Sequence, residues 1–344
     1  MKSLPPEGEL VARLQALFAT RRRDVILGIG DDAAVVNPGG PLVLTTDLLI
    51  EDQDFRRDAD PGRLGRKTLA VNLSDLAAMG ATPLYALLSL GLPRNAKPEW
   101  FEAFVTGLDD SARESGVAVV GGDLSASGVL VASLTLAGRA PARGVLTRSG
   151  AAAGDTLFIS GTLGAAAAGL ALLEAGFRLT SDGVARGPSK RAVASAHADE
   201  VSRLIRHQVD PRAMVDLGRA LADLRIASAA LDVSDGLARD LHRLCRASGV
   251  GATIELDALP IDSAILGLRK LVTIDPREAA LFGGEDFGLL FTVPKRRLAA
   301  AERLTRRFAL RKIGTINGSR RVLLATKGSL SPLPDAGFDH FGTD

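Results

Sequence analysis

The chain has few of the residues that build disulfides, transition-metal sites or base-stacking surfaces. It holds one cysteine in 344 residues, which excludes an intramolecular disulfide and a cysteine-based zinc site. Its four histidines are dispersed, which argues against a histidine-carboxylate iron site. Aromatic residues make up 4% of the chain and the net charge is only +2. Together these numbers argue against a dedicated nucleic-acid-binding protein, so we expect no nucleic acid among its partners.

The chain also lacks a long apolar run. No stretch reaches the ~18 consecutive apolar residues that a membrane-spanning helix needs, and residues 1–9 have no apolar core of the kind found in signal peptides. We therefore expect a cytoplasmic protein without a membrane partner. Arginines cluster at 21–23, 296–297 and 303–312. We interpret these clusters as solvated surface, and the last as the outer face of an amphipathic helix.

Strand-like and helix-like patterns alternate along both halves of the chain. The length favours about two domains, and a stretch rich in Gly, Ala, Pro and Arg at 138–154 separates them. The sequence thus predicts an α/β (α+β) protein with domains at 1–140 and 150–344, each a mixed sheet with packed helices. Polar, glycine-bearing residues at 176–189 predict a mobile loop. Predicted helices lie at 9–19, 64–79, 98–115, 165–174, 190–208, 213–223, 237–247, 262–271 and 294–308; predicted strands lie at 25–29, 42–46, 84–92, 117–120, 129–136, 156–160, 227–233, 252–256, 287–293, 310–316 and 320–325.

Aspartates gather in five short motifs, and four of these directly follow an apolar run. Aspartate is depleted in strands, so acids at the ends of buried strands are costly unless they converge on a cation. Carboxylates with hydroxyl neighbours are the ligands that hard divalent ions take, often together with substrate phosphates. The sequence therefore predicts a phosphate site with several magnesium ions. The motifs are Gly-Ile-Gly-Asp31-Asp32, Thr45-Thr46-Asp47, Asn72-Leu-Ser-Asp75, Gly121-Gly122-Asp123 and Asp232-Val-Ser-Asp235.

Each acid also has a structural explanation when taken alone. Asp32 fits a turn, Asp75 fits a solvated helix face, and Asp232, Ser234 or Asp235 would cap a helix that begins near Gly236. Five such coincidences in one chain are a weaker explanation than a shared cation.

Three glycine-bearing segments resemble phosphate-binding loops. Gly28-Ile-Gly30 has no room for the helix that a dinucleotide fingerprint must open. Gly62 to Thr68 has the wrong glycine spacing for a P-loop, so we expect Lys67 on the surface of a helix. Ser160-Gly-Thr-Leu-Gly164 precedes an alanine-rich helix. It fits either an anion site at a helix N-terminus or a tight strand-to-helix turn.

Read in order, the motifs resemble the thiamine-monophosphate kinase family. The resemblance covers nearly the whole chain, and its most specific parts are Asn72 to Ala81 and Gly337-Phe-Asp-His340. The Gly-Asp-Asp and Gly-Gly-Asp pieces are shared more broadly in a superfamily that includes aminoimidazole-ribonucleotide synthetase. Further matching motifs are Thr-Thr-Asp47, Gly-Gly-Asp123, Ser160-Gly-Thr-Leu-Gly164, Asp232-Val-Ser-Asp235-Gly-Leu and Gly-Gly-Glu285-Asp286-Phe.

The resemblance implies an aminoimidazole-ribonucleotide synthetase-like two-domain fold that forms a homodimer through its N-terminal domains. It implies transfer of the γ-phosphoryl of ATP to thiamine monophosphate, which gives thiamine diphosphate, with several Mg²⁺ ions. By motif, the magnesium ligands would be Asp31, Thr45, Thr46, Asp47, Asp75, Asp123, Asp232 and Asp235. ATP would contact Gly122, Asp123, Arg148 and Ser234; the thiamine substrate would contact Asp54, Glu285 and Phe338, with the Phe338 ring on the cationic thiazolium.

The chemistry agrees with this function. Both substrates are polyanions, so metals and a cation such as Arg148 must neutralise charge. The attacking phosphate has a second pKa of about 6 and is largely ionised at neutral pH. No general base is then needed, and none is assigned.

The chain departs from the family pattern at three positions, which support the second of two alternatives that stay open. Asp54 stands where a histidine is usual, Val105 where an aromatic residue is frequent, and Gly288 where a glutamate is usual. One alternative is another ATP-using enzyme of the superfamily. The other is a catalytically silent module that binds a nucleotide or thiamine phosphate.

Overall fold

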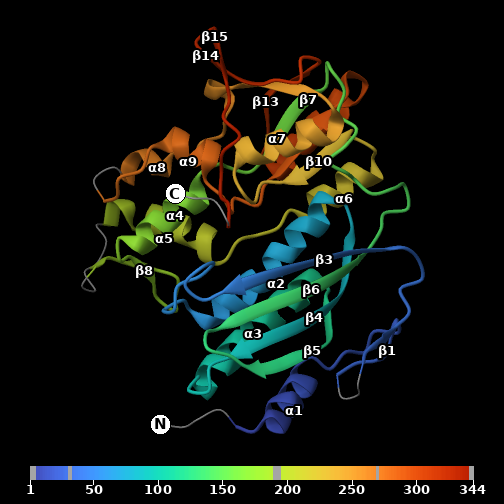
Figure 1. Ribbon diagram of the computed structural model, residues 1–344, viewed down its shortest axis with the longest axis vertical. Helices are drawn as coiled ribbons and strands as arrows, with labels where there is room; N and C mark the ends of the chain where they lie inside the picture. The colour runs from blue at the N-terminus through green and yellow to red at the C-terminus, as the bar shows by residue number, and fades with distance from the viewer. Residues whose placement is uncertain (1–4, 30–32, 189–194, 269–270, 341–344) are drawn as a thin grey trace. The chain divides into compact units, whose positions relative to one another are not determined.

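A computed structural model describes residues 5–29, 33–188, 195–268 and 271–340 (Figure 1). The chain divides into two compact units. The N-terminal unit comprises Met1–Leu76 and Ala81–Ala142, and the C-terminal unit comprises Ala77–Gly80 and Arg143–Asp344. Each unit is a mixed sheet with packed helices, which confirms the predicted fold class. Among the described residues, no helix is long and apolar enough to cross a membrane.

A four-stranded sheet forms the N-terminal unit, with the order β3-β6-β4-β5. Only the β4–β5 pair is parallel. Leu88 and Leu134 are buried on the face covered by helices, whereas Leu44 and Leu48 are exposed on the open face. Alternation of side chains along each strand separates the two faces. The elements are β3 (Leu42–Ile50), β4 (Thr82–Leu92), β5 (Ala118–Ala126), β6 (Val131–Arg139), α2 (Pro61–Ala78) and α3 (Pro98–Ser115).

Glycines allow α2 and α3 to pack closely. A Cβ at Gly65 would lie 2.1 Å from the carbonyl oxygen of Phe104, and one at Gly107 would lie 1.9 Å from that of Gly62. Helix α3 begins with Pro98 in its first turn and ends at Gly116 in the left-handed conformation, which are favoured start and stop residues. Lys67 of α2 is buried, so the expectation that it lies on a helix surface was wrong.

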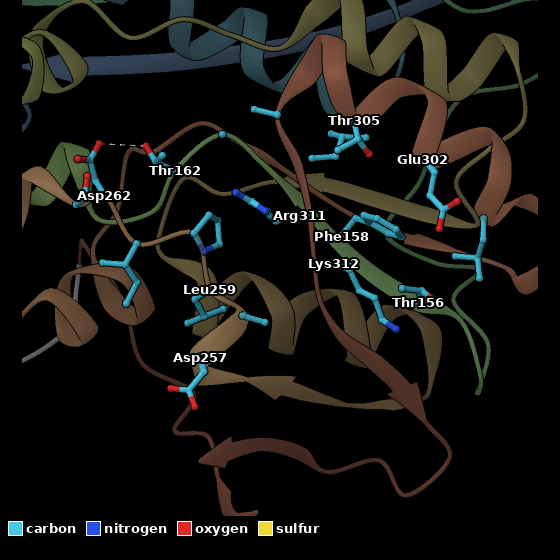
Figure 2. Close-up of a pocket in the computed structure, with 18 of the residues that line it drawn as sticks. Thr156, Phe158, Thr162, Asp257, Leu259, Asp262, Glu302, Thr305, Arg311 and Lys312 are labelled. Carbon is cyan, nitrogen blue, oxygen red and sulfur yellow. Dashed lines mark hydrogen bonds between the residues drawn. The ribbon is translucent and has the colours of Figure 1, made fainter. Parts of the chain in front are cut away.

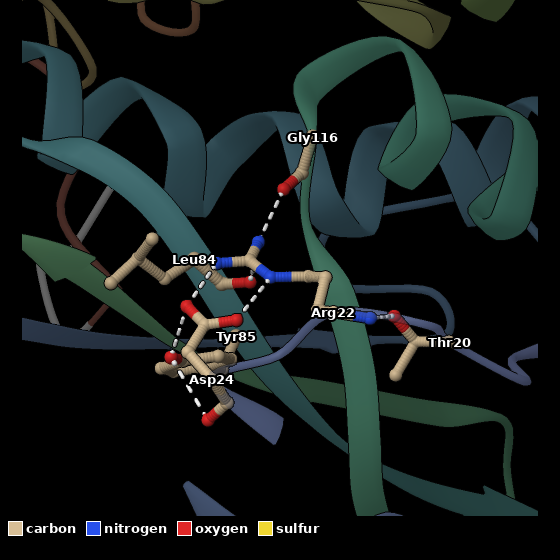
Figure 3. Close-up of polar contacts among 6 residues, drawn as sticks. All are labelled: Thr20, Arg22, Asp24, Leu84, Tyr85 and Gly116. Carbon is tan, nitrogen blue, oxygen red and sulfur yellow. Dashed lines mark hydrogen bonds and ion pairs between the residues drawn. The ribbon is translucent and has the colours of Figure 1, made fainter. Parts of the chain in front are cut away.

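Arg22 is one of the residues that connect the segment before the sheet to the rest of the unit. Helix α1 (Glu7–Leu17) leads to β1 (Val25–Leu27), which pairs with β2 (Val35–Val36). Figure 3 shows the Arg22 guanidinium donating to the Asp24 carboxylate and to the carbonyl oxygens of Leu84 and Gly116. The Tyr85 hydroxyl also donates to Asp24, at 2.6 Å. The interpretation of this arginine cluster as solvated surface therefore fails for Arg22, because carbonyl acceptors distant in sequence surround it.

A seven-stranded sheet forms the C-terminal unit, with the order β10-β12-β7-β13-β11-β14-β15. Only β11–β14 is parallel. One core, with Leu231 and Ile254 from the sheet, packs under α7 and α9. A second core, with Phe158 and Phe291, packs under α6 and α10 on the other face. The strands are β7 (Thr156–Ser160), β10 (Ala229–Asp232), β11 (Gly251–Glu255), β12 (Leu289–Val293), β13 (Leu310–Asn317), β14 (Val322–Thr326) and β15 (Ser329–Pro332).

Helices α4, α5 and α8 form a third core beside this sheet. Helix α9 is capped by the Asp275 carboxylate, which accepts hydrogen bonds from the amides of Arg277 and Glu278. The helices are α4 (Ala165–Glu174), α5 (Ser195–Val209), α6 (Val215–Asp223), α7 (Leu237–Ser248), α8 (Ala264–Gly267), α9 (Pro276–Phe282) and α10 (Leu298–Phe308), with the short 3-10 turns η2 (Leu256–Ala258) and η4 (Lys295–Arg297).

Several predicted boundaries were wrong. Strands β3 and β5 do not end at their aspartates but continue three residues past Asp47 and Asp123. Within the predicted loop 176–189 the chain forms a hairpin of β8 (Arg178–Leu179) and β9 (Ala185–Arg186). Within the predicted helix at 262–271, the described residues form only the one-turn α8, and α9 and β15 were not predicted. For β3 and β5 pairing with neighbouring strands extends the strand past the aspartate, whereas β8 and β9 pair with each other across a short turn.

Candidate active site

The first candidate cluster lies where strand β3 passes helix α2. Thr45 and Asp47 are two residues apart on β3, so their side chains share the covered face of the sheet. The Thr45 hydroxyl donates a hydrogen bond to the Asp75 carboxylate of α2. Atom Oδ2 of Asp47 is buried and has no hydrogen-bond partner in the described structure.

The environment of Asp47 disfavours its charged form. Burial, and then the charge of Asp75, raise the pKa of Asp47 to about 6. A buried carboxylate oxygen without a partner is costly, and a bound cation would remove that cost. Two carboxylates with a hydroxyl neighbour supply the oxygen ligands of a hard divalent ion. The donor set at this position therefore fits Mg²⁺.

Thr46 and Asp123 belong to the same sheet as Asp47 but to other cross-strand pairs. Thr46 is paired with Thr135, and their hydroxyl oxygens are 3.2 Å apart. Asp123 stands opposite Ser89 and is exposed, with the Ser125 hydroxyl 3.4 Å from its Oδ2. Because side chains alternate along β3, Thr46 points to the face of the sheet opposite Asp47. Gly122 is needed here because a Cβ would lie 1.8 Å from the carbonyl oxygen of Leu88.

Two other predicted residues of this unit have different positions. Asp31 and Asp32 lie outside the described residues. Asp54 uses its carboxylate within its own turn, where Oδ2 accepts a hydrogen bond from the Ile50 amide at 2.8 Å. In the described part of the chain, no three His, Cys, Asp or Glu side chains gather into a metal site by themselves. The full magnesium set stays a prediction.

The second candidate cluster is the loop that follows strand β10 in the C-terminal unit. Asp232 ends this strand and is buried. The amides of Ser234 and Asp235 both donate to Oδ2 of Asp240, at 3.1 and 3.0 Å. Arg243 forms ion pairs with Asp235 and, at 2.8 Å, with Asp240. Burial is the main reason that the pKa of Asp240 is raised to about 6. This carboxylate fixes the shape of the Ser234–Asp235 loop.

The loop that carries Glu285 packs directly on the Ser234–Asp235 loop. The amide of Glu285 donates to the carbonyl oxygen of Ser234 at 2.7 Å, and that of Phe287 donates to Val233 at 2.9 Å. Glu285 has a φ of 65°, a conformation that non-glycine residues rarely adopt. Its carboxylate accepts a hydrogen bond from the side-chain amide of Gln208 on α5.

Asp286 occupies the helix N-terminus that the sequence offered as an anion site. Its carboxylate accepts hydrogen bonds from the amides of Gly164, at 2.7 Å, and Ala166, at 3.1 Å. Burial raises the pKa of Asp286 to about 7, although these amides act in the opposite direction. The helix N-terminus after Ser160–Gly164 therefore does bind an anion, and that anion is the protein's own Asp286 carboxylate.

The C-terminal segment also contacts the Asp235 loop. The amide of Phe338 donates to the carbonyl oxygen of Asp235 at 2.9 Å. A Cβ at Gly337 would lie 2.3 Å from that oxygen, so the close approach requires glycine. The Phe338 ring is 48% exposed and is therefore available to a ligand. Arg148, the predicted ATP contact, has an exposed side chain.

Three motifs that are far apart in the sequence thus meet in the C-terminal unit, around Ser234 and Asp235. The sequence did not single out Asp240, Asp286, Gln208 or Arg243, although they shape these loops. Asp286 stood next to a selected residue, and Asp240 lies in the first turn of a helix, where acids are favoured. Gln208 gave no signal, because its partner is 77 residues away.

Comparison with known proteins identifies the family of this chain. Residues 30–140 match the family model of the AIR synthase related protein, N-terminal domain, and residues 152–325 match that of the C-terminal domain. These two matches together cover most of the chain and show that it is an AIR synthase related protein. Over 291 residues the chain is 40% identical to the thiamine-monophosphate kinase of Salmonella typhimurium, which covers 84% of this chain and 83% of that protein. The chain belongs to the thiamine-monophosphate kinase family and is an enzyme.

Two solved structures resemble the chain along most of its length. The crystal structure of thiamine-monophosphate kinase from Stenotrophomonas maltophilia K279a has a TM-score of 0.80 and 36% identity, and the match covers 95% of this chain and 99% of that one. The structure of AaThiL complexed with AMPPCP and TMP has a TM-score of 0.75 and 31% identity, with 97% of both chains covered.

Proposed function

We propose that this enzyme transfers the γ-phosphoryl group of ATP directly to the phosphate of thiamine monophosphate, which yields thiamine diphosphate and ADP. The observation that carries the proposal is a similar structure, matched over 97% of both chains, that holds AMPPCP, an ATP analogue, together with TMP. The contacts among the Asp232–Asp235, Glu285 and Phe338 segments support it, because these segments carry three of the motifs on which the resemblance rests.

Magnesium is part of the proposal. Its ligands would be drawn from Asp31, Thr45, Thr46, Asp47, Asp75, Asp123, Asp232 and Asp235. When bound, Mg²⁺ would neutralise charge on the phosphates of both substrates. The unpartnered Oδ2 of Asp47 and the raised pKa of that carboxyl support a cation at this place.

The protein's own residues would hold the substrates in the transfer geometry. ATP would lie against Gly122, Asp123, Ser234 and the exposed guanidinium of Arg148. Glu285, oriented by Gln208, would face the thiamine moiety together with the open ring of Phe338. The Asp54 carboxylate already accepts the Ile50 amide, so any contribution to substrate binding uses its remaining lone pairs.

The acceptor needs no general base. A phosphate monoester has a second pKa of about 6 and is largely dianionic at neutral pH, so its oxygen attacks without losing a proton to the protein. In this reaction the acceptor oxygen forms the new P–O bond in line with the bond to ADP that breaks. Catalysis then rests on positioning and on charge neutralisation.

We also propose a cytoplasmic homodimer that pairs through the open face of the four-stranded sheet. Leu44, Leu48 and Leu87 are 66%, 50% and 43% exposed on that face, and self-association would bury them. Light scattering during size-exclusion chromatography tests this. Leu44→Glu with Leu48→Glu should give a monomer, whereas Leu330→Glu, at a 62% exposed position on β15, should leave a dimer. A monomeric parent chain would contradict the proposal.

One assay tests the reaction. Purified protein is mixed with ATP, Mg²⁺ and thiamine monophosphate, and thiamine diphosphate is detected by mass spectrometry. We expect product that disappears when EDTA removes the metal. Absence of product from protein that binds ATP would transfer the assignment to another acceptor, or to a silent binding module.

A further inference from the structure

The last described residues of the chain form an irregular segment that lies against helix α7. We call residues 333–340 the C-terminal strap. Leu333, at its start, is buried in the core under α7, and its amide donates to the carbonyl oxygen of Val322 at 3.0 Å. No residue of the strap lines the cavity of about 970 Å³ at the start of β13 (Figure 2). The strap therefore presents its side chains to a ligand outside that cavity.

Three side chains of α7 fasten the strap to the helix. Their positions are three and four residues apart, so they share one face of α7. The strap follows this face from the last turns of the helix back to its first turn. The contacts join His242 Nε2 to the carbonyl oxygen of Leu333 at 2.9 Å, Arg246 to the Asp335 carboxylate, and Arg239 Nη1 to the Asp339 carboxylate at 2.9 Å.

The two ion pairs differ in how exposed their arginines are. The acids Asp335 and Asp339 are equally exposed, at 43%, but the Arg246 side chain is 58% exposed and that of Arg239 only 21%. Exposed ion pairs contribute little. Atom Nε of Arg239 is buried and has no hydrogen-bond partner among the described residues, so this guanidinium depends on Asp339 for its compensation. The pair at Arg239 should therefore fasten the strap more firmly.

This pair also determines which way the neighbouring ring faces. Gly337 lies against α7, where a Cβ would be 3.0 Å from the Cβ of Arg239, and Asp339 turns back to the same arginine. Consecutive side chains of an extended segment point in opposite directions. Phe338 is accordingly exposed, and its ring meets that of His340 edge to face, with the centroids 4.7 Å apart. Holding Asp339 on α7 thus keeps the ring turned outward.

We propose that Arg239 is a positioning residue for thiamine recognition, whose ion pair with Asp339 fixes the orientation in which Phe338 meets the substrate. The inference deepens the proposed function and rests on it, because the ring is there a contact of the thiamine moiety. A cation is attracted only when it lies over the face of the ring. A ring that is already held in this orientation loses less freedom on binding, which favours affinity.

Steady-state kinetics separate this role from a general one. Arg239→Met removes the guanidinium but keeps an apolar stem, and Asp339→Asn removes the carboxylate. Each should raise KM for thiamine monophosphate about tenfold, the value of a modest charged hydrogen bond. Neither kcat nor KM for ATP should change, since binding lost equally from ground and transition states raises KM alone. The double variant should be no worse than the worse single one, because both remove the same interaction. Arg239→Lys should recover part of the loss.

The matched control is Arg246→Met, on the same face of the same helix. Its partner Asp335 belongs to the same strap, and we expect KM to change by less than about twofold. A second measurement does not depend on the reaction. Trp100→Phe removes the single tryptophan of the chain, and Phe338→Trp then places one at the ring position. Fluorescence anisotropy of this reporter should fall when Arg239→Met is added, because the strap gains nanosecond motion, and should not fall with Arg246→Met.

Other results would overturn the proposal. A parental KM in Arg239→Met, with normal turnover of the parent chain, would refute the role of Arg239 and leave the proposed function intact. An equal rise in KM for Arg246→Met, or a fall in kcat together with the melting temperature, would show a structural effect only. Unchanged anisotropy would refute the hold on the strap. A parent chain that forms no thiamine diphosphate would refute the proposed function, and the thiamine role of Arg239 with it.

Discussion

The acids of the two units differ in how their charge is balanced. In the N-terminal unit, Asp47 is held beside Asp75 with one oxygen buried and unpartnered. In the C-terminal unit, Asp235 is paired with Arg243, Asp262 with Arg203, and Asp286 with two helix amides. The protein thus compensates those acids that shape its loops. Among these acids, Asp47 is the one with a buried oxygen that no described residue compensates, and it marks the place where an external cation would contribute most.

The largest expected effect follows from removing either carboxylate of the Asp47–Asp75 pair. Asp47→Asn and Asp75→Asn should each lower kcat/KM for thiamine monophosphate by about a hundredfold or more, because even residues behind a metal ligand cost 10- to 100-fold. The metal-free melting temperature should not fall, since like-charge repulsion is relieved. Steady-state kinetics and calorimetry measure both. Asp110→Asn, at an exposed position on α3, is the control, and near-normal turnover of Asp47→Asn would refute the metal assignment.

Loss of a compensated acid should instead destabilise the fold. Asp286→Asn keeps one acceptor oxygen, but its side-chain NH₂ group then meets a backbone N–H, and two donors cannot form a hydrogen bond. We expect the free energy of unfolding in urea at pH 8 to fall by about 1–3 kcal/mol. Asp275→Asn is the matched control. Its acid also caps a helix, but at an exposed position where Asn caps equally well. Equal losses in the two variants would mean that burial of Asp286 is irrelevant.

The raised pKa of Asp286 also predicts a pH dependence. The folded carboxyl binds a proton up to about pH 7, whereas the unfolded one releases it near 3.8. This contribution to stability is therefore full below about pH 4 and is lost as the pH rises through 7. The difference in unfolding free energy between the parent chain and Asp286→Asn should shift in that direction across this window. A difference in unfolding free energy that does not change with pH would contradict the raised pKa of Asp286.

A smaller effect is expected at Gln208, which orients Glu285. Gln208→Ala should raise KM for thiamine monophosphate about fivefold with little change in kcat, the equivalent of one neutral hydrogen bond. Gln208→Glu should be worse, because it sets a second carboxylate against Glu285. Gln15→Ala, at an exposed position on α1, should change neither constant. A fall in kcat alone would show that Glu285 does not act in substrate binding.

The smallest effect is expected at Asp24, an acid of the N-terminal unit whose charge is compensated. Hydrogen bonds from Arg22 and Tyr85 hold the pKa of Asp24 below its usual 3.8. The stability this contributes is present above pH 3.8 and is lost as the pH falls below that value, which is the opposite sign to Asp286. The stability gap between the parent chain and Asp24→Asn should narrow in acid, as followed by circular dichroism. A constant gap would show that the ion pair is not responsible.

Periodicity and turn residues predicted most of the elements, and motif order predicted the family. Helix α3 illustrates this, because Pro98 and Gly116 mark its two ends in the sequence. The features that could not be predicted depend on residues that are far apart in the sequence. Asp47 lies within a strand because β6 pairs with the residues on both sides of it. Asp286 reaches the α4 amides because β12, which follows it, pairs with β7, which precedes α4, and nothing local in Gly-Gly-Glu-Asp-Phe records that pairing.

The contact between Asp286 and helix α4 has a consequence for the order of assembly. Its amide partners lie 122 and 120 residues earlier in the chain, so closing this contact fixes much of the C-terminal unit at once. Contacts of such large sequence separation form slowly, because the entropy of closing the intervening chain is lost before they stabilise anything. The backbone turn that presents Glu285 should therefore be among the last parts to reach its final shape. A chain still folding, or truncated before residue 286, would carry the aspartates that we propose as magnesium ligands without the formed loop that we propose faces the thiamine moiety.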